Sequence, residues 1–277
     1  MLVRTLSSIV FLLVVLPCIF FSSTHLFVVF TLFLCVRAVY EMLRCNKLHT
    51  NVALSIPMYL ISLFPVLARY CGSDMFYSLI FPTIFVCSFL VLSVYTFMKN
   101  KPELGKVMSS WFFSLYACAG FTSLVLLADK FNGAWHVMLF AFIAAWVTDS
   151  CALVCGMLFG KHKLLPSVSP KKTIEGAIGG VFFCVIAFLL YAKLLEVYMD
   201  YTIVSYTKIA LCGLACSIVA VIGDLLFSAV KRASDIKDFG RLMPGHGGIL
   251  DRFDSLISIA LVLLMFVSIT NIFTFIE

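Results

Sequence analysis

Residues 5–36 read "TLSSIVFLLVVLPCIFFSSTHLFVVFTLFLCV" and contain no Lys, Arg, Asp or Glu. An apolar run of ~20 residues is long enough to cross the hydrocarbon core of a bilayer as a helix. The rest of the 277-residue chain has the same character, with 62% hydrophobic residues, 12% charged residues and a mean hydropathy of +1.09. A soluble domain has about 25% charged residues. The composition therefore predicts an all-α polytopic membrane protein.

About nine apolar segments are long enough to be transmembrane helices. A retained first helix is favoured over a cleaved signal peptide, because no small-x-small cleavage site follows the first apolar run. No linker separates the segments, so we predict a single integral membrane domain over residues 1–277, with apolar helical spans in 1–140 and a catalytic half in 141–277. The predicted spans are Leu6–Phe21, Leu26–Met42, Val52–Ala68, Phe76–Met98, Val107–Ala128, Trp135–Phe159, Ala177–Leu195, Ile209–Val230 and Leu256–Phe275.

Lys and Arg are distributed unevenly over the predicted loops. With nine spans and a cytoplasmic N-terminus, only four of the 20 Lys and Arg fall in outer loops, and nearly all the others fall on the cytoplasmic side, where these residues are enriched in membrane proteins. The C-terminus is then predicted to lie outside. The net charge of +6 follows from this topology and is too scattered for nucleic acid, so no nucleic-acid partner is expected. The four exceptions are Arg69, Lys130, Lys193 and Lys208.

Asp224 stands inside an apolar predicted span, in the segment "VIGDLLFSAVKR" (residues 221–232). Helical spacing places Ser228 and Lys231 on the same face as Asp224. A carboxylate inside a membrane segment usually faces a cavity or a partner and is functional. We therefore interpret Asp224 as a site residue; the alternative is a structural ion pair between Asp224 and Lys231.

The next polar loop ends in "PGHGGILDRFD" (residues 244–254). Its glycines, among them Gly247 and Gly248, favour a tight turn whose backbone amides can approach an anion. His246 lies in this turn and is assigned no proton-transfer role. Asp251 and Asp254, at the start of the last predicted helix, project from one side of it. Acidic residues also stabilise a helix N-terminus, and this structural role accounts for one of the two.

Aspartates beside Lys and Arg are typical of sites that handle phosphate through a metal ion. Mg²⁺ takes one or two carboxylates and leaves its other positions to water and substrate phosphates. Nearby cations neutralise charge on the transferred group. The pattern predicts Mg²⁺ as the cofactor and does not decide between one ion and two. The cations near these aspartates are Lys231, Arg232, Lys237, Arg241 and Arg252.

The loop "GKHKLLPSVSPKKTIEG" (residues 160–176) is a second candidate phosphate-binding element. Ser169 is predicted as a helix N-cap and Pro170 as the first helical residue. Lys171 and Lys172 would then lie in the first turn, where cations are unfavourable unless an anion binds at the helix end. We therefore predict that both lysines bind phosphate.

Asp149 lies upstream, in "AAWVTDSCALVCGMLFGK" (residues 144–161). Gly156 and Gly160 share its helical face, and a small-xxx-small pair lets two membrane helices approach closely. Asp149 is therefore predicted to face a neighbouring helix or the site, and not lipid.

The segment "SAVKRASDIKDFGRLMPGHGGILDRFD" (residues 228–254) closely resembles the signature of the phosphatidate cytidylyltransferase family, also called CDP-diacylglycerol synthases. Asp149, "FGKHKL" and "SPKKTIEGAIGG" are similar to that family too, so the resemblance covers roughly residues 149–254. Met243 and Met157 depart from the family pattern. Met157 stands where many members have Arg, so a phosphate contact by that Arg is not carried over.

The resemblance implies roles for individual residues. Asp224 and Asp251 resemble the metal-ligand carboxylates of the family, with Asp254 and Asp149 as further candidates. The implied catalytic residues are Asp224, Lys231, Asp251 and Asp254. The implied substrate phosphate-binding residues are Lys171, Lys172, Ser228, Arg232, His246, Gly247, Gly248 and Arg252, with the individual roles of Ser228 and His246 left open.

The reaction of the family joins CTP and phosphatidate to give CDP-diacylglycerol and pyrophosphate, with magnesium, in phospholipid biosynthesis. The expected partners are CTP, phosphatidate and membrane lipids, and the glycine-containing helix faces are compatible with a homodimer. From the compact size of the chain we expect a bacterial cell inner membrane, with the active site facing the cytoplasm.

Two other functions are left open by the residues alone. A membrane lipid kinase that uses CTP to phosphorylate a polyprenol-type alcohol would need the same basic loops and carboxylates, but also a general base, for which no candidate stands out. A transporter would use Asp149 and Asp224 as ion-pathway groups. Against a transporter, the polar residues gather in loops on one face of the membrane.

Overall fold

The computed structural model describes residues 13–131, 135–198, 201–203, 205–243, 245, 247–270 and 273–275. The described chain is mostly helical, with two short two-stranded sheets. Eight of its helical segments are long and apolar enough to cross a membrane. The prediction of a helical, polytopic membrane protein is therefore confirmed, with the sheets as small additions. Residues 6–12 of the first predicted span, Leu6–Phe21, lie outside the described residues, and residues 13–20 of it are helical.

The eight segments agree with the predicted spans to within a few residues at most ends. They are α2 (His25–Cys45), the broken span Val52–Tyr70, Met75–Phe97 within α5 (Ser73–Phe97), α6 (Leu104–Lys130), α7 (Trp135–Phe159), α8 (Ile174–Tyr198), α9 (Tyr206–Ala233) and α10 (Leu250–Ile269).

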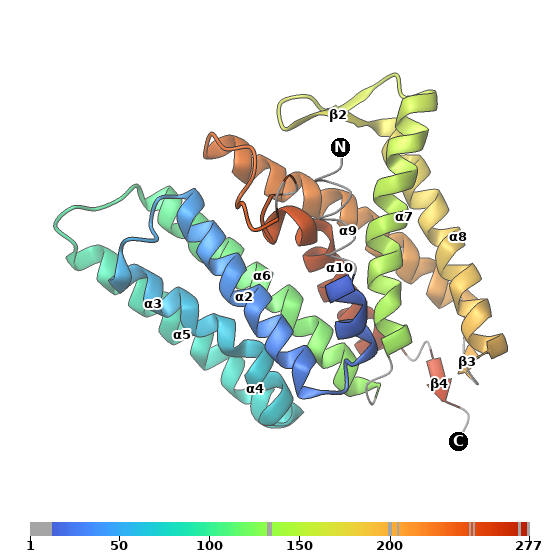
Figure 1. Ribbon diagram of the computed structural model, residues 1–277, viewed down its shortest axis with the longest axis horizontal. Coiled ribbons are helices and arrows are strands. Elements are labelled where there is room, and N and C mark those ends of the chain that lie inside the picture. Colours follow the sequence, from blue (N-terminus) through green and yellow to red (C-terminus); the bar gives the residue numbers. More distant parts are fainter. Residues whose placement is uncertain are drawn as a thin grey trace. The chain divides into compact units, whose positions relative to one another are not determined.

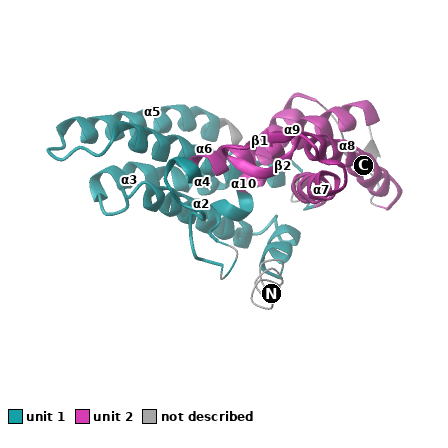
Figure 2. Ribbon diagram, turned by 90° about the horizontal axis from the view of Figure 1, so that it is seen from above, with its two compact units in different colours: residues 1–135, 231–253 teal, residues 136–230, 254–277 magenta. Residues whose placement is uncertain are grey.

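The chain divides into two compact units, coloured separately in Figure 2. Unit 1 comprises residues 1–135 and 231–253, and unit 2 comprises residues 136–230 and 254–277. The divisions fall inside α9 and α10, so each of these helices contributes residues to both units. The single-domain organisation inferred from the sequence stays a prediction.

In unit 1, α2 lies beside α6 (Figure 1), and α3 packs on α5. Both α2 and α6 bury small side chains completely, which lets membrane helices approach closely. At the end of α2, Asn46 donates its Nδ2 hydrogen to Ser110 Oγ of α6 at 2.9 Å. The fully buried small residues include Cys35, Ala38, Ala117 and Cys118.

The second described span is broken into α3 (Val52–Leu60), a 3₁₀ turn η1 (Ile61–Leu63) and α4 (Phe64–Tyr70). Pro65 occupies the first turn of α4. Because proline has no backbone N–H and its ring crowds the preceding turn, an α-helix cannot continue unchanged through this position. A 3₁₀ turn before proline accommodates the lost hydrogen bond, so the span tightens there without ending.

In unit 2, glycines bring α7 and α8 into close contact. A Cβ atom at Gly176 would lie 2.5 Å from the carbonyl oxygen of Ala152, and one at Gly180 would lie 2.6 Å from that of Thr148. Such distances are excluded for real side chains, so only glycine fits at these positions of α8. On α7, Gly156 lies opposite Gly176, as its small-residue spacing predicts.

The loop between α7 and α8 forms a β-hairpin, so the predicted helix start at Ser169 is wrong. Strand β1 (Lys163–Leu165) pairs antiparallel with β2 (Ser169–Thr173), which contains Pro170 as well as Lys171 and Lys172. A two-stranded sheet has only edges, where proline is tolerated. Thr173 instead takes the capping role, because its Oγ1 accepts a hydrogen bond from Gly176 N at 3.1 Å.

The last helix begins and ends earlier than the predicted Leu256–Phe275. It spans Leu250–Ile269, and residues Phe273–Phe275 form strand β4, which pairs antiparallel with β3 (Tyr201–Ile203). The sequence of β4, Phe-Thr-Phe, consists of residue types that favour strands. Apolar character alone did not distinguish this strand from the end of a membrane helix.

Candidate active site

Unit 2 contains a cavity of about 610 Å³ that gathers several predicted site residues. We call it the acid–lysine cavity. Asp149 and Gly156 of α7 line it together with Asp224 of α9. The β-hairpin contributes Lys163, Lys171 and Lys172. The structure therefore brings together residues that lie up to 75 positions apart in the sequence. Asp149 lines this cavity, and its role as a site residue stays a prediction.

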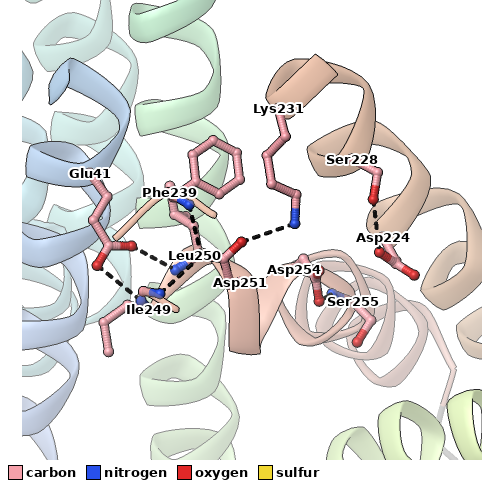
Figure 3. Close-up of polar contacts among 11 residues, drawn as sticks. Glu41, Asp224, Ser228, Lys231, Phe239, Ile249, Leu250, Asp251, Asp254 and Ser255 are labelled. Carbon is pink, nitrogen blue, oxygen red and sulfur yellow. Dashed lines mark hydrogen bonds and ion pairs between the residues drawn. The ribbon is translucent and has the colours of Figure 1, made fainter. Parts of the chain in front are cut away.

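Asp224 is bound on two sides within the acid–lysine cavity. Its Oδ2 atom forms an ion pair with Lys172 Nζ, and Ser228 Oγ donates a hydrogen bond to its Oδ1 atom at 3.3 Å (Figure 3 shows Ser228). The two charged side chains are 23% and 26% exposed, so substrate or water can still reach them. The alternative ion pair between Asp224 and Lys231 is not formed, because Lys172 occupies that role.

The hairpin that carries the lysines is fixed at its base to the first turn of α8. The carboxylate of Glu175 accepts hydrogen bonds from the backbone N–H of His162 at 3.2 Å and contacts the His162 ring Nδ1 at 2.6 Å. The backbone N–H of Ile174 also donates to the carbonyl of His162 at 3.0 Å. Lys171 and Lys172 thus reach the cavity from a strand and not from the first turn of a helix.

The acid–lysine cavity fits magnesium with a phosphate ligand. Within the described part of the chain, no three His, Cys, Asp or Glu side chains gather into a metal site. Two carboxylates, Asp149 and Asp224, do line this cavity, beside three lysines. Mg²⁺ is commonly held by one or two carboxylates, with waters and substrate phosphates completing its shell. The donor set therefore suits a metal ion that arrives with, or is completed by, a polyphosphate.

In unit 1, Asp251 organises the loop between α9 and α10. Its Oδ2 atom accepts hydrogen bonds from the backbone N–H of Phe239 at 2.8 Å and of Gly248 at 2.9 Å. Its Oδ1 atom accepts one from Lys231 Nζ at 2.9 Å (Figure 3). The Asp251 side chain is only 3% exposed. Both oxygens are thus engaged by protein donors, and the carboxylate holds the loop closed on itself.

The glycines of this loop allow the close approach to Asp251. Gly247 has a φ of +87°, in the region that favours glycine, and a Cβ atom there would lie 2.7 Å from Asp251 Oδ2. Gly247 also exchanges two backbone hydrogen bonds with Met243, at 3.0 and 3.2 Å. The amide of Gly248 points at a carboxylate of the protein itself, where the sequence predicted a phosphate. His246 lies outside the described residues.

Glu41 of α2 is a site residue that the sequence reasoning missed. Its carboxylate is fully buried and accepts hydrogen bonds from the backbone N–H groups of Ile249 and Leu250, each at 3.0 Å (Figure 3). These amides begin α10, directly before Asp251. Cβ atoms at Gly240 and Gly248 would lie 2.6 and 2.4 Å from the Glu41 carboxylate oxygens. The signal was present, because an acid inside an apolar span usually has a partner.

A second polar cavity of about 360 Å³ lies in unit 1, where the end of α2 meets the same loop. Three cations line it, together with one acid, Asp238. Two of the cations, Lys237 and Arg241, were predicted to handle phosphate, and the third, Arg44, was not singled out. Their side chains can balance the charge of an anionic group that enters this space. The lining cations are Arg44, Lys237 and Arg241.

The remaining predicted residues lie at the ends of α9 and α10. Arg232 belongs to the last turn of α9, and Arg252 to the first turn of α10, and both are exposed. Asp254 accepts a hydrogen bond from the backbone N–H of Ser255 at 2.8 Å (Figure 3). This contact lies within the first turns of α10, where acidic side chains are favourable.

Residues 2–270 match the sequence profile of the Cytidylyltransferase family. The phosphatidate cytidylyltransferase of Staphylococcus haemolyticus (strain JCSC1435) is 34% identical over 255 residues, which cover 91% of this chain and 94% of that protein. The protein of the same name from Staphylococcus aureus (strain COL) is 32% identical over 255 residues, with the same coverage. The match includes the apolar N-terminal half, for which the sequence motifs gave no resemblance. The chain therefore belongs to the cytidylyltransferase family.

Proposed function

We propose that this chain transfers the cytidylyl group of CTP to phosphatidate, releasing pyrophosphate and forming CDP-diacylglycerol. The observation that carries the proposal is the acid–lysine cavity, in which Asp149 and Asp224 lie beside Lys163, Lys171 and Lys172. The names of the similar proteins give the reaction, and this donor set is suited to its two polyanionic substrates. The enzyme is accordingly a nucleotidyltransferase of phospholipid biosynthesis.

The reaction needs no nucleophilic side chain. An oxygen of the phosphatidate phosphate forms a bond to the α-phosphorus of CTP, and the bond from that phosphorus to the bridging oxygen of pyrophosphate breaks. The protein must hold two mutually repelling anions in line, and positioning of this kind can supply much of the rate enhancement. Lys163, Lys171 and Lys172 neutralise phosphate charge in the acid–lysine cavity.

Asp224 and Asp149 are the carboxylates proposed to hold magnesium in the acid–lysine cavity. When bound, Mg²⁺ would supply positive charge that stabilises the phosphates as they react. Asp224 is at present neutralised by Lys172, with Ser228 orienting its other oxygen. With Mg²⁺ held by Asp224, the Lys172 ammonium would be available to a substrate phosphate.

Asp251 is proposed as a second metal- or substrate-binding carboxylate because of its hydrogen-bond partners. Its Oδ2 atom is held by two backbone amides, whereas its Oδ1 atom has the Lys231 ammonium as partner. A metal ion or substrate that binds at Oδ1 would release Lys231 for a phosphate, in the same manner as Lys172. Asp254, Arg232 and Arg252 are proposed to act beside it at the same ends of α9 and α10.

We propose nine spans with the N-terminus in the cytoplasm and the C-terminus outside, in a bacterial inner membrane. The loops between α5 and α6, α7 and α8, and α9 and α10, together with the adjoining helix turns, carry 12 of the 20 Lys and Arg, as cytoplasmic loops do. Each polar cavity includes residues of one of these loops, so we propose that each opens toward the cytoplasm. A homodimer and the absence of a nucleic-acid partner stay predictions.

The proposed reaction is tested with CTP labelled at the α or the γ phosphate in separate incubations. Purified protein in detergent receives phosphatidate and Mg²⁺, and the lipid is extracted. Label in the lipid from α-labelled CTP alone is the expected result. Incubation with a polyprenol tests the kinase alternative, in which label would come from γ-labelled CTP alone. Lipid that stays unlabelled in every incubation would contradict both.

A further inference from the structure

We propose that an apolar groove between α8 and α9 holds an acyl chain of the phosphatidate substrate during the reaction. This inference rests on the proposed function, and it adds a lipid-chain site to it. We call the space the α8–α9 groove; its volume is about 540 Å³. That is within the ~300–1,000 Å³ range of small-molecule sites.

The α8–α9 groove is continuous with the acid–lysine cavity. Ala177 of α8 and Val221 of α9 line both spaces. These residues lie four and three positions along the chain from Thr173 and Asp224, which line the polar cavity. A molecule with a phosphate head and an apolar tail can therefore occupy both spaces at once, with its head among the lysines.

Every side chain that lines the α8–α9 groove is apolar. On α8 the wall continues from Ala177 through Val181 to Val185, at helical intervals of four residues. On α9 it continues from Ile222 through Ile218 to Leu214. The end of the groove nearest the acid–lysine cavity thus lies at Ala177 and Val221. Each further turn of α8 and α9 carries the groove farther from the charged residues.

The length of the α8–α9 groove matches one leaflet. Eight residues separate Ala177 from Val185, which corresponds to ~12 Å along a helix. Half of a bilayer hydrocarbon core is ~15 Å. A chain that starts at the head-group level would therefore lie in the groove over most of its own leaflet.

Direct contact between α8 and α9 accompanies the far part of the α8–α9 groove. A Cβ atom at Gly213 of α9 would lie 2.9 Å from the Phe188 ring of α8, and Phe188 is only 1% exposed. The Cys184 thiol, also on α8, lies 3.9 Å from the Gly213 carbonyl oxygen. The two helices therefore touch at the depth of the last lining residues, Val185 and Leu214.

The proposal is tested by filling the groove and comparing a long-chain with a short-chain phosphatidate. Val181→Trp narrows the groove from α8, and Ile218→Trp narrows it from α9. Leu190→Trp is the matched control, because Leu190 is an exposed α8 residue outside the groove lining. For each variant we would measure kcat/KM with dioleoyl phosphatidate and with dihexanoyl phosphatidate in the same micelles.

We define the ratio as kcat/KM with dioleoyl phosphatidate divided by kcat/KM with dihexanoyl phosphatidate. The groove variants should lower this ratio about tenfold, which corresponds to the loss of about two buried methylene contacts. Leu190→Trp should leave the ratio as in the wild type. A ratio unchanged in both groove variants, or changed equally in the control, would overturn the proposal.

A second measurement needs no variant. Phosphatidate with a photoactivatable diazirine in mid-chain should label α8 and α9 within residues 181–185 and 214–218. If the protein transfers the cytidylyl group from α-labelled CTP but the diazirine labels other residues, the proposed acyl-chain site is overturned and the proposed function is not. Failure of the wild type to use either chain length would instead overturn the proposed function.

Discussion

Replacing Glu41 with Ala should loosen the start of α10 and with it the loop that Asp251 organises. The carboxylate of Glu41 is 0% exposed and accepts two hydrogen bonds of 3.0 Å, from the amides of Ile249 and Leu250. Hydrogen bonds to charged groups contribute about 1.5–3 kcal/mol each, so losing both removes about 3–6 kcal/mol. Relief from burying a charge offsets part of this. We expect a net destabilisation of about 3 kcal/mol, at the lower end of that range.

The assay is thermal unfolding of the purified protein in detergent, together with limited proteolysis of the loop at residues 236–248. A loss of about 3 kcal/mol should lower the Tm by roughly 6–12 °C. Glu41→Gln keeps one accepting oxygen and should give an intermediate Tm. The control is Glu103→Ala, because Glu103 is 69% exposed and its ion pair is with Lys106, three residues along the same helix end. A Tm and a cleavage pattern equal to those of the wild type in Glu41→Ala would refute the anchoring role of Glu41.

Three further predictions concern the same machinery. Lys231→Ala leaves the buried Asp251 carboxylate without its cation, and the free energy of unfolding should fall by about 3 kcal/mol. A double-mutant cycle with Asp251→Ala measures the coupling between the two residues, and additive effects would count against the ion pair. Gly248→Ala should destabilise strongly, since its Cβ would lie 2.4 Å from a Glu41 oxygen, whereas Gly105→Ala, whose nearest atom lies 3.7 Å away, should leave the Tm unchanged or raised. Chelation with EDTA should abolish cytidylyl transfer, and added Mg²⁺ should restore it. The Asp224→Asn variant should need ~10-fold more Mg²⁺ than the wild type for its half-maximal rate. An equal Mg²⁺ requirement in both proteins would argue against Asp224 as a metal ligand.

The membrane spans could be predicted from the sequence because apolar length is a local property. The span Trp135–Phe159 was predicted with the bounds that the structure gives. The helical face shared by Asp224 and Ser228 also followed from spacing, and the two residues are hydrogen-bonded. Asp149 could be placed toward the site because the glycines on its face indicated a close helix neighbour.

Partner choice could not be predicted, because it depends on which segments fold together. Spacing along α9 suggested Lys231 as the partner of Asp224, but a strand from a distant loop supplies Lys172. That strand itself was missed, since Ser-Pro before a basic pair is also typical of a helix start. Glu41 contacts amides 208 and 209 positions away, a pairing that no local pattern encodes.

We expect the carboxylates of the acid–lysine cavity to support cytidylyl transfer from CTP to phosphatidate. A comparison of the wild type with Asp224→Asn, both shown to be folded by their Tm, measures the rate at which α-labelled CTP labels phosphatidate with Mg²⁺ present. The wild type should label the lipid, and the rate should be about 10²–10³-fold lower in the variant, as for loss of one electrostatic contact in the transition state. Equal rates in the two proteins would contradict this expectation.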